Sequence, residues 1–136
     1  MRYDTKIAVV VRDELATWQK LNVASFLAGG LVAAYPELGG ARYADASGQG
    51  YGPLIRQPVL VFAADGPALA RALRRALDRG LQPCVYTRAL FATDNDADNR
   101  AAVAAVSTDA LDLAGLALHA PRRDVDRVTA GLHLHP

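Results

Sequence analysis

Short apolar runs alternate with longer segments of helical periodicity along the chain. Four apolar runs have the pattern of buried strands in a sheet, and they lie at residues 5–11, 58–64, 82–87 and 113–119. Four helices are expected after these strands, at residues 17–35, 65–80, 96–105 and 121–130. The alternation of strand and helix predicts a single α/β domain of three layers over residues 1–136.

The first helix, at residues 17–35, is apolar almost all round. Thr17 is expected to cap its N-terminus, and Pro36 ends it. A helix of this kind is expected to be buried on more than one side, either beneath a neighbouring element or in a subunit interface. Trp18 is accordingly expected in the core, with the wall of a pocket as the alternative.

The segment 36–57 shows no helical period and contains five glycines and two prolines. It is long for a passive loop in a compact domain. Tyr43 and Tyr51 flank a turn-rich centre that includes Asp45 and Gly48, and this pattern predicts a projecting β-hairpin over residues 43–51.

Composition is typical of a globular protein rather than a disordered one. The chain is 51% hydrophobic and 21% charged. Its 15 basic and 14 acidic residues give a net charge of +1, which lacks the overall positive charge typical of nucleic-acid-binding proteins. A single cysteine, Cys84, excludes an internal disulfide and fits a reducing compartment. Arg2 and Asp4 precede the first apolar run, and the longest nearly apolar stretch, 21–35, is shorter than the roughly 20 residues of a membrane span. We therefore expect a cytoplasmic protein with no secretory signal and no membrane segment.

Lys20 is the most suggestive candidate for a ligand site. A lysine in the first turn of a helix opposes the helix dipole by about 0.3–1 kcal/mol unless an anion compensates, and the free N–H groups there also favour anions. Arg12, at the end of the first strand, could face the same crevice beyond the carboxyl ends of the parallel strands. A small anionic ligand near Lys20 is therefore expected; in the alternative, Lys20 is solvated or paired with Asp13 or Glu14.

Further polar residues could complete this site. Asn22 follows Lys20 on the same helix, and it either faces a ligand or bonds neighbouring backbone. Thr87 and Arg88 leave the third strand towards the same edge, and Thr93 and Asn99 could lie above them as a polar rim. In the alternative, each of these residues is an ordinary polar residue of a surface loop or helix and binds no ligand.

No pattern indicates a metal or a cofactor. The three histidines, His119, His133 and His135, have no cysteine or histidine partners at metal-ligand spacing, so no metal site is expected. The chain contains no Walker loop, no GxGxxG after a strand and no GxSxG, and we expect no cofactor. The arginines of the second helix are expected to form a solvated face, which makes tRNA a weakly supported partner.

Several stretches resemble known families. The opening DTKIAVVVRDEL, the stretch PVLVFAADGPALARALRRALDRGLQPCVYT and the ending ALHAPRRDVDRVTAGLHLHP are similar to type 2 peptidyl-tRNA hydrolases. The run ATWQKLN, the hairpin and the run LIRQP together resemble the uncharacterised bacterial domain-of-unknown-function family 2000. This resemblance implies a mixed four-stranded sheet in the order 2-1-4-3, with the last strand antiparallel, helices on both faces and an inserted β-hairpin.

The hydrolase resemblance also bears on activity. Lys20 matches the lysine that these hydrolases place on their first helix, whereas Ala24 and Leu27 occupy the positions of a glutamine and a histidine. Thr87 stands at the position of an aspartate, and Thr93 could stand for a threonine. We therefore expect a protein that binds a small anion near Lys20 without the hydrolase's catalytic set. The alternatives are a hydrolase of peptidyl or aminoacyl esters and a homodimeric interaction module.

Overall fold

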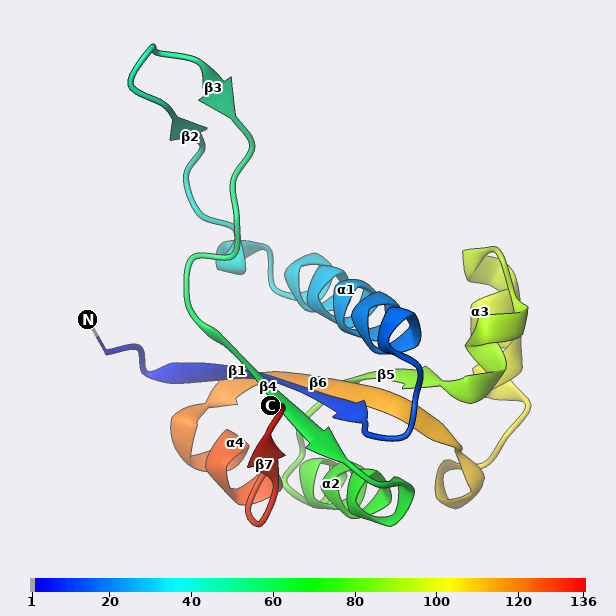
Figure 1. Cartoon of the computed structure of the whole chain (residues 1–136). Helices are drawn as coiled ribbons and strands as arrows, with labels where there is room; N and C mark the ends of the chain where they lie inside the picture. The colour runs from blue at the N-terminus through cyan, green and yellow to red at the C-terminus, as the bar shows by residue number, and fades with distance from the viewer. Residues whose placement is uncertain (1) are drawn as a thin grey trace.

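Strand β1 (Thr5–Arg12) lies at the centre of a mixed five-stranded sheet in the computed structural model, which describes residues 2–136 (Figure 1). The order across the sheet is β5-β6-β1-β4-β7. β1 pairs in parallel with β4 and antiparallel with β6. The predicted mixed α/β fold is therefore confirmed. The other strands of this sheet are β4 (Val59–Ala64), β5 (Cys84–Thr87), β6 (Leu113–Pro121) and β7 (His133–Leu134).

The expectation of four strands is wrong, because the end of the chain adds β7 beside β4. Gly131 has a φ of +83°, a left-handed conformation that glycine adopts without strain, and it turns the chain back after α4 (Arg122–Val128). β7 then pairs antiparallel with β4, and the N–H of His135 donates to the carbonyl oxygen of Val61 at 2.8 Å. Two residues are too few to show the alternation by which a strand is recognised in a sequence.

Helices cover both faces of the sheet. α1 (Thr17–Ala34) lies on one face, whereas α2 (Gly66–Asp78) and α4 lie on the other (Figure 1). α3 (Asp96–Ala104) stands at the β5 side of the molecule, across from the N-terminal end of α1 (Figure 1). Among residues 2–136, no helix has both the length and the apolar character needed to cross a bilayer. Three short 3-10 helices lie at Pro36–Leu38, Arg88–Ala92 and Thr108–Ala110.

Alternate side chains of β1 enter two separate cores, because successive residues of a strand point to opposite faces of the sheet. Val10 lies in the core beneath α2 and α4 with Leu69 and Val125. Val9 lies in the core beneath α1 with Val23 and Leu31. The central strand is therefore buried on both sides, as its continuous apolar sequence predicts.

α1 approaches β6 so closely that one position of the strand has no room for a side chain. A Cβ atom on Gly115 would lie 2.5 Å from Cγ1 of Val23 and 2.9 Å from Cδ1 of Leu27. Both distances are far below van der Waals contact, so the helix can adopt this position only over glycine. This contact fixes the height of α1 above the sheet, and with it one wall of the groove described below.

The expectation that α1 is buried on more than one side is wrong for the single chain. Only its sheet-facing stripe, represented by Val23 and Leu31, is buried. Trp18 is 62% exposed, Leu21 64% and Phe26 56%, so Trp18 does not belong to the core. The periodicity of the helix could not reveal this, because its outward face is apolar too.

The N-terminus of α1 also differs from the expectation. Ala16, rather than Thr17, is the N-cap residue, and it has no side-chain oxygen to offer the helix. The side chain of Gln19 instead accepts a hydrogen bond from the N–H of Ala16 at 3.0 Å.

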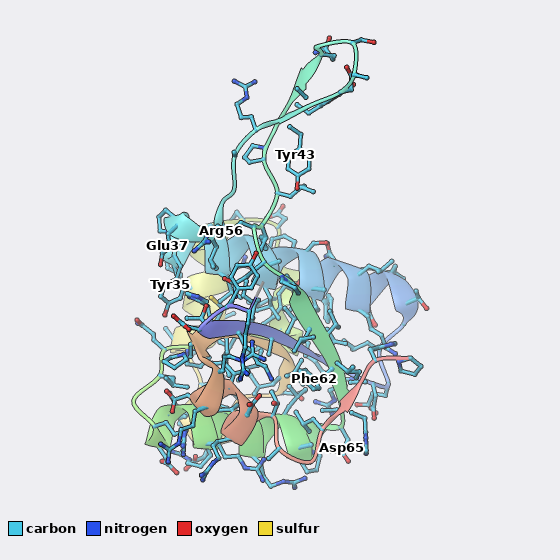
Figure 2. The ribbon with its side chains drawn as sticks, turned by 90° about the vertical axis from the view of Figure 1, so that its left-hand side faces the viewer. Tyr35, Glu37, Tyr43, Arg56, Phe62 and Asp65 are labelled. Carbon is cyan, nitrogen blue, oxygen red and sulfur yellow. The ribbon has the colours of Figure 1, made fainter. Side chains whose placement is uncertain are left out.

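The predicted hairpin is confirmed as β2 (Tyr43–Ala44) and β3 (Gly50–Tyr51), which project from the body of the molecule (Figure 1). Figure 2 shows this arm rising beyond Tyr35, Glu37 and Arg56. At its tip, the Asp45 carboxylate accepts hydrogen bonds from the N–H groups of Ser47 and Gln49 and from the hydroxyl of Tyr51. The arm is therefore held by its own polar contacts while its surface remains exposed.

Candidate functional site

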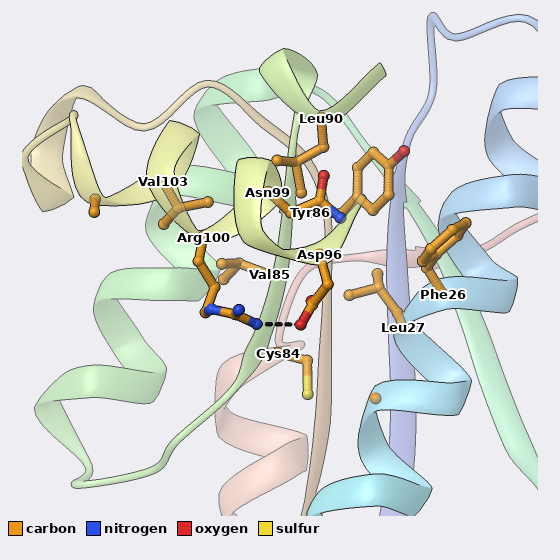
Figure 3. Close-up of a pocket in the computed structure, with 12 residues that line it drawn as sticks. Phe26, Leu27, Cys84, Val85, Tyr86, Leu90, Asp96, Asn99, Arg100 and Val103 are labelled. Atoms are coloured by element: carbon orange, nitrogen blue, oxygen red, sulfur yellow. Dashed lines mark hydrogen bonds and ion pairs between the residues drawn. The ribbon is translucent and has the colours of Figure 1, made fainter. Parts of the chain in front are cut away.

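A groove with two adjoining chambers lies between α1 and α3, with β5 at its floor. The large chamber has a volume of about 570 Å³, and the small chamber has a volume of about 360 Å³. The large chamber is lined by Phe26, Leu27, Gly30, Cys84, Val85, Tyr86, Leu90, Asp96, Asn99, Arg100, Val103 and Ala104 (Figure 3). The small chamber is lined by Trp18, Asn22, Phe26, Tyr86, Leu90, Phe91, Thr93, Asp94, Asn95, Asp96 and Asn99.

Four aromatic rings form a continuous cluster at the boundary between the chambers. The ring of Tyr86, from β5, has its centre 5.8 Å from that of Phe26 on α1 and 5.1 Å from that of Phe91. Trp18, at the start of α1, meets Phe91 edge to face at 6.0 Å. Aromatic pairs at these separations stabilise one another. The cluster therefore joins α1, β5 and the 3-10 helix that follows β5.

The hydroxyl of Tyr86 is the central polar group of the groove. Tyr86 is only 6% exposed, and its hydroxyl forms no hydrogen bond within residues 2–136. Burial raises the pKa of Tyr86, so the hydroxyl stays protonated at neutral pH and can both donate and accept. The hydroxyl oxygen itself is not fully buried, so it is open to solvent or to a ligand.

Polar side chains from the loop after β5 and from α3 surround the small chamber. The hydroxyl of Thr93 donates to the carbonyl oxygen of Leu90 at 2.9 Å and also contacts the side chain of Asn99. Asn95 caps α3 by accepting from the N–H of Asp98 at 2.9 Å, and its side-chain amide donates to Asp94 at 3.0 Å. These bonds hold the rim of the groove in one arrangement.

One ion pair lies beside the large chamber. Arg100 and Asp96, one turn apart on α3, are joined through their guanidinium and carboxylate groups (Figure 3). The first turn of α3 carries Asp96 and Asp98, whose negative charge complements the helix dipole.

Of the polar residues that the sequence singles out, the structure brings Asn22, Thr93 and Asn99 together in the small chamber. Trp18 lines the same chamber, in agreement with the pocket-wall alternative. Lys20 lines neither chamber, and its Nζ atom lies 3.2 Å from Nε2 of His135 in the tail after β7. The lysine is therefore neither free nor paired with Asp13 or Glu14, the two partners considered from the sequence.

Arg12 and Arg88 belong to a charge cluster away from the groove. The guanidinium of Arg12 lies 2.6 Å from Asp112 and 2.7 Å from Glu14, and Arg88 lies 3.3 Å from the same Glu14 oxygen. Partial burial opposes the charge of Arg12, but the bonds to Asp112 and Glu14 outweigh it and raise its pKa. Thr87 is buried, and its hydroxyl has no partner among the described residues.

The depression at the carboxyl ends of β1 and β4 holds neither Lys20 nor Arg12. Its polar lining residues are Asp13, Asp65, Arg71, Arg75 and His133. Lys20 and Arg12 line neither this depression nor the two chambers of the groove, and a crevice shared by the two residues stays a prediction.

Sequence reasoning missed the aromatic cluster and the acidic side of the small chamber. In the sequence, Tyr86 fits the apolar pattern of the third predicted strand. Phe91 lies in a segment that shows neither a helix nor a strand pattern. The 3-10 helix Arg88–Ala92 turns the chain so that Phe91 returns to the Tyr86 ring. No spacing rule for helices or strands predicts that contact.

The side chains that line the groove define the chemistry it can offer. No histidine lines either chamber among residues 2–136. Cys84 lies in the large chamber, but burial raises its pKa, and this keeps the thiol in its less reactive protonated form. The remaining groups offer hydrogen bonds, aromatic faces and charge.

Comparison with known families identifies one that spans almost the whole chain. Residues 5–136 match the family described as "Protein of unknown function (DUF2000)". The solved structure of a protein of unknown function, Atu0240 from Agrobacterium tumefaciens strain C58, is 44% identical and has a TM-score of 0.97, with 99% of this chain and 100% of that chain covered. No curated protein matches the chain. The chain therefore belongs to the DUF2000 family of proteins of unknown function.

Proposed function

We propose that this protein binds a small molecule in the groove between α1 and α3. The observation that carries the proposal is Tyr86, which is 6% exposed, lacks a hydrogen-bond partner for its hydroxyl among residues 2–136 and lines both the mainly apolar large chamber and the more polar small chamber. Ligand sites in proteins are concave, largely apolar and equipped with a few convergent polar groups, and they have volumes of this order. Asn22 and Thr93 supply further polar groups in the small chamber.

A thermal-shift screen of metabolites tests this proposal, because a ligand that binds only the native state raises the melting temperature. A hit is expected to lose most of its effect in Tyr86→Phe, which removes only the hydroxyl. Tyr43→Phe, on the exposed hairpin, is the matched control and should leave the shift unchanged. A screen with no hit, or hits that Tyr86→Phe does not weaken, would count against the groove.

Hydrolysis of peptidyl or aminoacyl esters, with tRNA as a partner, is the alternative suggested by the resemblance to type 2 peptidyl-tRNA hydrolases. Ala24 and Leu27, in place of a glutamine and a histidine, cannot transfer a proton, and this favours binding without catalysis. Incubation with peptidyl-tRNA decides between the two. Turnover that disappears in Lys20→Ala would favour the hydrolase.

An anion at Lys20 is a separate proposal. It is supported by the place of Lys20 in the first turn of α1, where the helix dipole favours negative charge. Such an anion would contact the Nζ atom of Lys20, which also lies 3.2 Å from Nε2 of His135. Inorganic phosphate is expected to stabilise the wild type and Lys6→Met but not Lys20→Met, and equal effects on all three would remove the case for the site.

A homodimer is the second candidate, and the outward face of α1 favours it. Between residues 21 and 34 this helix has no charged residue, yet Leu21 and Phe26 are more than half exposed. Apolar surface of this extent on a helix is typical of an interface.

We also propose that the protein is cytoplasmic, where its single cysteine would remain reduced.

A further inference from the structure

We propose that the ligand of the groove is an organic cation, with an ammonium group in the small chamber and an apolar body in the large chamber. This inference rests on the proposed binding function and names the chemical class of the ligand. It depends on how charge and apolar surface are divided between the two chambers.

The small chamber is acidic. Among residues 2–136, the charged side chains that line it are Asp94 and Asp96, and no basic side chain lines it. The one base at the groove, Arg100, lies in the large chamber and is paired with Asp96. Because Arg100 neutralises Asp96, Asp94 carries the uncompensated negative charge of the small chamber, and this charge favours a cation and repels an anion.

The aromatic cluster favours the same charge. Trp18, Phe26, Tyr86 and Phe91 all line the small chamber, next to the two carboxylates. Aromatic faces attract ammonium groups through their ring quadrupoles, and aromatic walls with nearby acceptors are a general means of holding such cations. The Tyr86 hydroxyl can accept a hydrogen bond from the same ammonium group.

The dipole of α3 alone accounts for acidic residues in its first turn. Tyr86 is independent of that dipole: it lines both chambers, it is 6% exposed, and its hydroxyl has no hydrogen-bond partner in the described chain. Figure 3 shows the ring between Phe26 of α1 and Leu90 and Asn99 opposite. The dipole of α3 does not explain this hydroxyl.

The large chamber fits the remainder of such a ligand. Leu27, Val85, Leu90 and Val103 give it apolar walls, and its volume of about 570 Å³ is within the range of small-molecule sites. Its two charged side chains neutralise one another. An apolar body attached to the ammonium group would therefore find apolar surroundings on this side of Tyr86.

Three probes of equal skeleton test the inference on the full chain: 3-phenylpropylamine, 3-phenylpropanol and 3-phenylpropionate. Ligand-detected NMR titrations should show the amine binding about tenfold more tightly than the alcohol, with the carboxylate weakest. Asp94→Asn should weaken the amine several-fold without changing the alcohol. Asp4→Asn, an exposed carboxylate at the start of β1, is the matched control and should change neither.

The outcomes separate the two proposals. If the carboxylate binds as well as the amine, and Tyr86→Phe weakens both, the groove is a ligand site but the cation inference is wrong. If Asp94→Asn leaves the preference for the amine intact, the inference is wrong as well. If none of the three probes binds, both the groove function and the cation inference are contradicted.

Discussion

The ring of Phe26 meets the ring of Tyr86 edge to face, with their centres 5.8 Å apart. This contact joins α1 to β5, and both rings line both chambers of the groove. Because Phe26 is 56% exposed, it contributes less to the core than its size suggests. Its position is explained better by the groove than by the packing of the fold.

Phe26→Ala is therefore expected to affect binding more than stability. Loss of the edge-to-face pair should lower the free energy of unfolding by about 0.5–1.5 kcal/mol. Affinity for a groove ligand should fall about tenfold, because the variant opens the wall between the chambers. Denaturant unfolding and ligand titration measure the two effects. Leu54→Ala, at a position that is 64% exposed near the base of the hairpin, should leave ligand affinity unchanged.

Gly115→Ala tests the close packing of α1 on β6. The added Cβ would lie 2.5 Å from Cγ1 of Val23, and overpacking of this kind costs about 1–3 kcal/mol. Urea unfolding should show that loss, and ligand affinity should fall too, because α1 must move away from β6 and so shift one wall of the groove. Gly52→Ala has open space around its Cβ and an unstrained backbone, and it should change stability by less than about 1 kcal/mol. Equal effects of the two substitutions would contradict this packing.

Leu21→Glu tests the homodimer. The variant places a charge on the outward apolar face of α1, where Leu21 is 64% exposed and makes little contribution to the monomer's core. Sedimentation equilibrium should show a dimer for the wild type and a monomer for the variant. Ala70→Glu, on the exposed face of α2, is the control and should remain dimeric. A wild type that stays monomeric at high concentration would exclude this interface.

The tip of the hairpin is expected to depend on pH. The hydrogen bond from the Tyr51 hydroxyl, followed by that from the Gln49 N–H, lowers the pKa of Asp45 below its unperturbed value of 3.8. Because the folded pKa is lowered, the carboxylate stabilises the tip above pH 3.8, and this stabilisation is lost as the pH falls through the lowered value.

An NMR titration of the Asp45 carboxyl carbon measures this pKa directly. Tyr51→Phe should raise it towards 3.8, since the largest cause of the shift is removed. Tyr43→Phe, at the paired position on β2, should leave it unchanged. An unchanged pKa in Tyr51→Phe would show that the tip is held in another way.

Local patterns predicted the elements of the fold, and contacts between distant segments decided the site. The buried run of β1 and the turn residues around Asp45 carry their structure in a few neighbouring positions, and both predictions are confirmed. The contact of Lys20 with His135 joins residues 115 positions apart, so no spacing along the chain could reveal it. The outward face of α1 is apolar although Leu21 and Phe26 are exposed on it, so the helical period alone could not distinguish this face from the core-facing one.

Trp18 offers the most direct test of the groove, because it is the only tryptophan of the chain and lines the small chamber. Its fluorescence should change saturably as 3-phenylpropylamine is added to the wild type. The change should be lost in Ala104→Phe, which fills the large chamber from an exposed position on α3, and weakened in Tyr86→Phe. A titration curve that both substitutions leave unaltered, or the absence of any change in the wild type, would contradict the assignment of this groove as the ligand site.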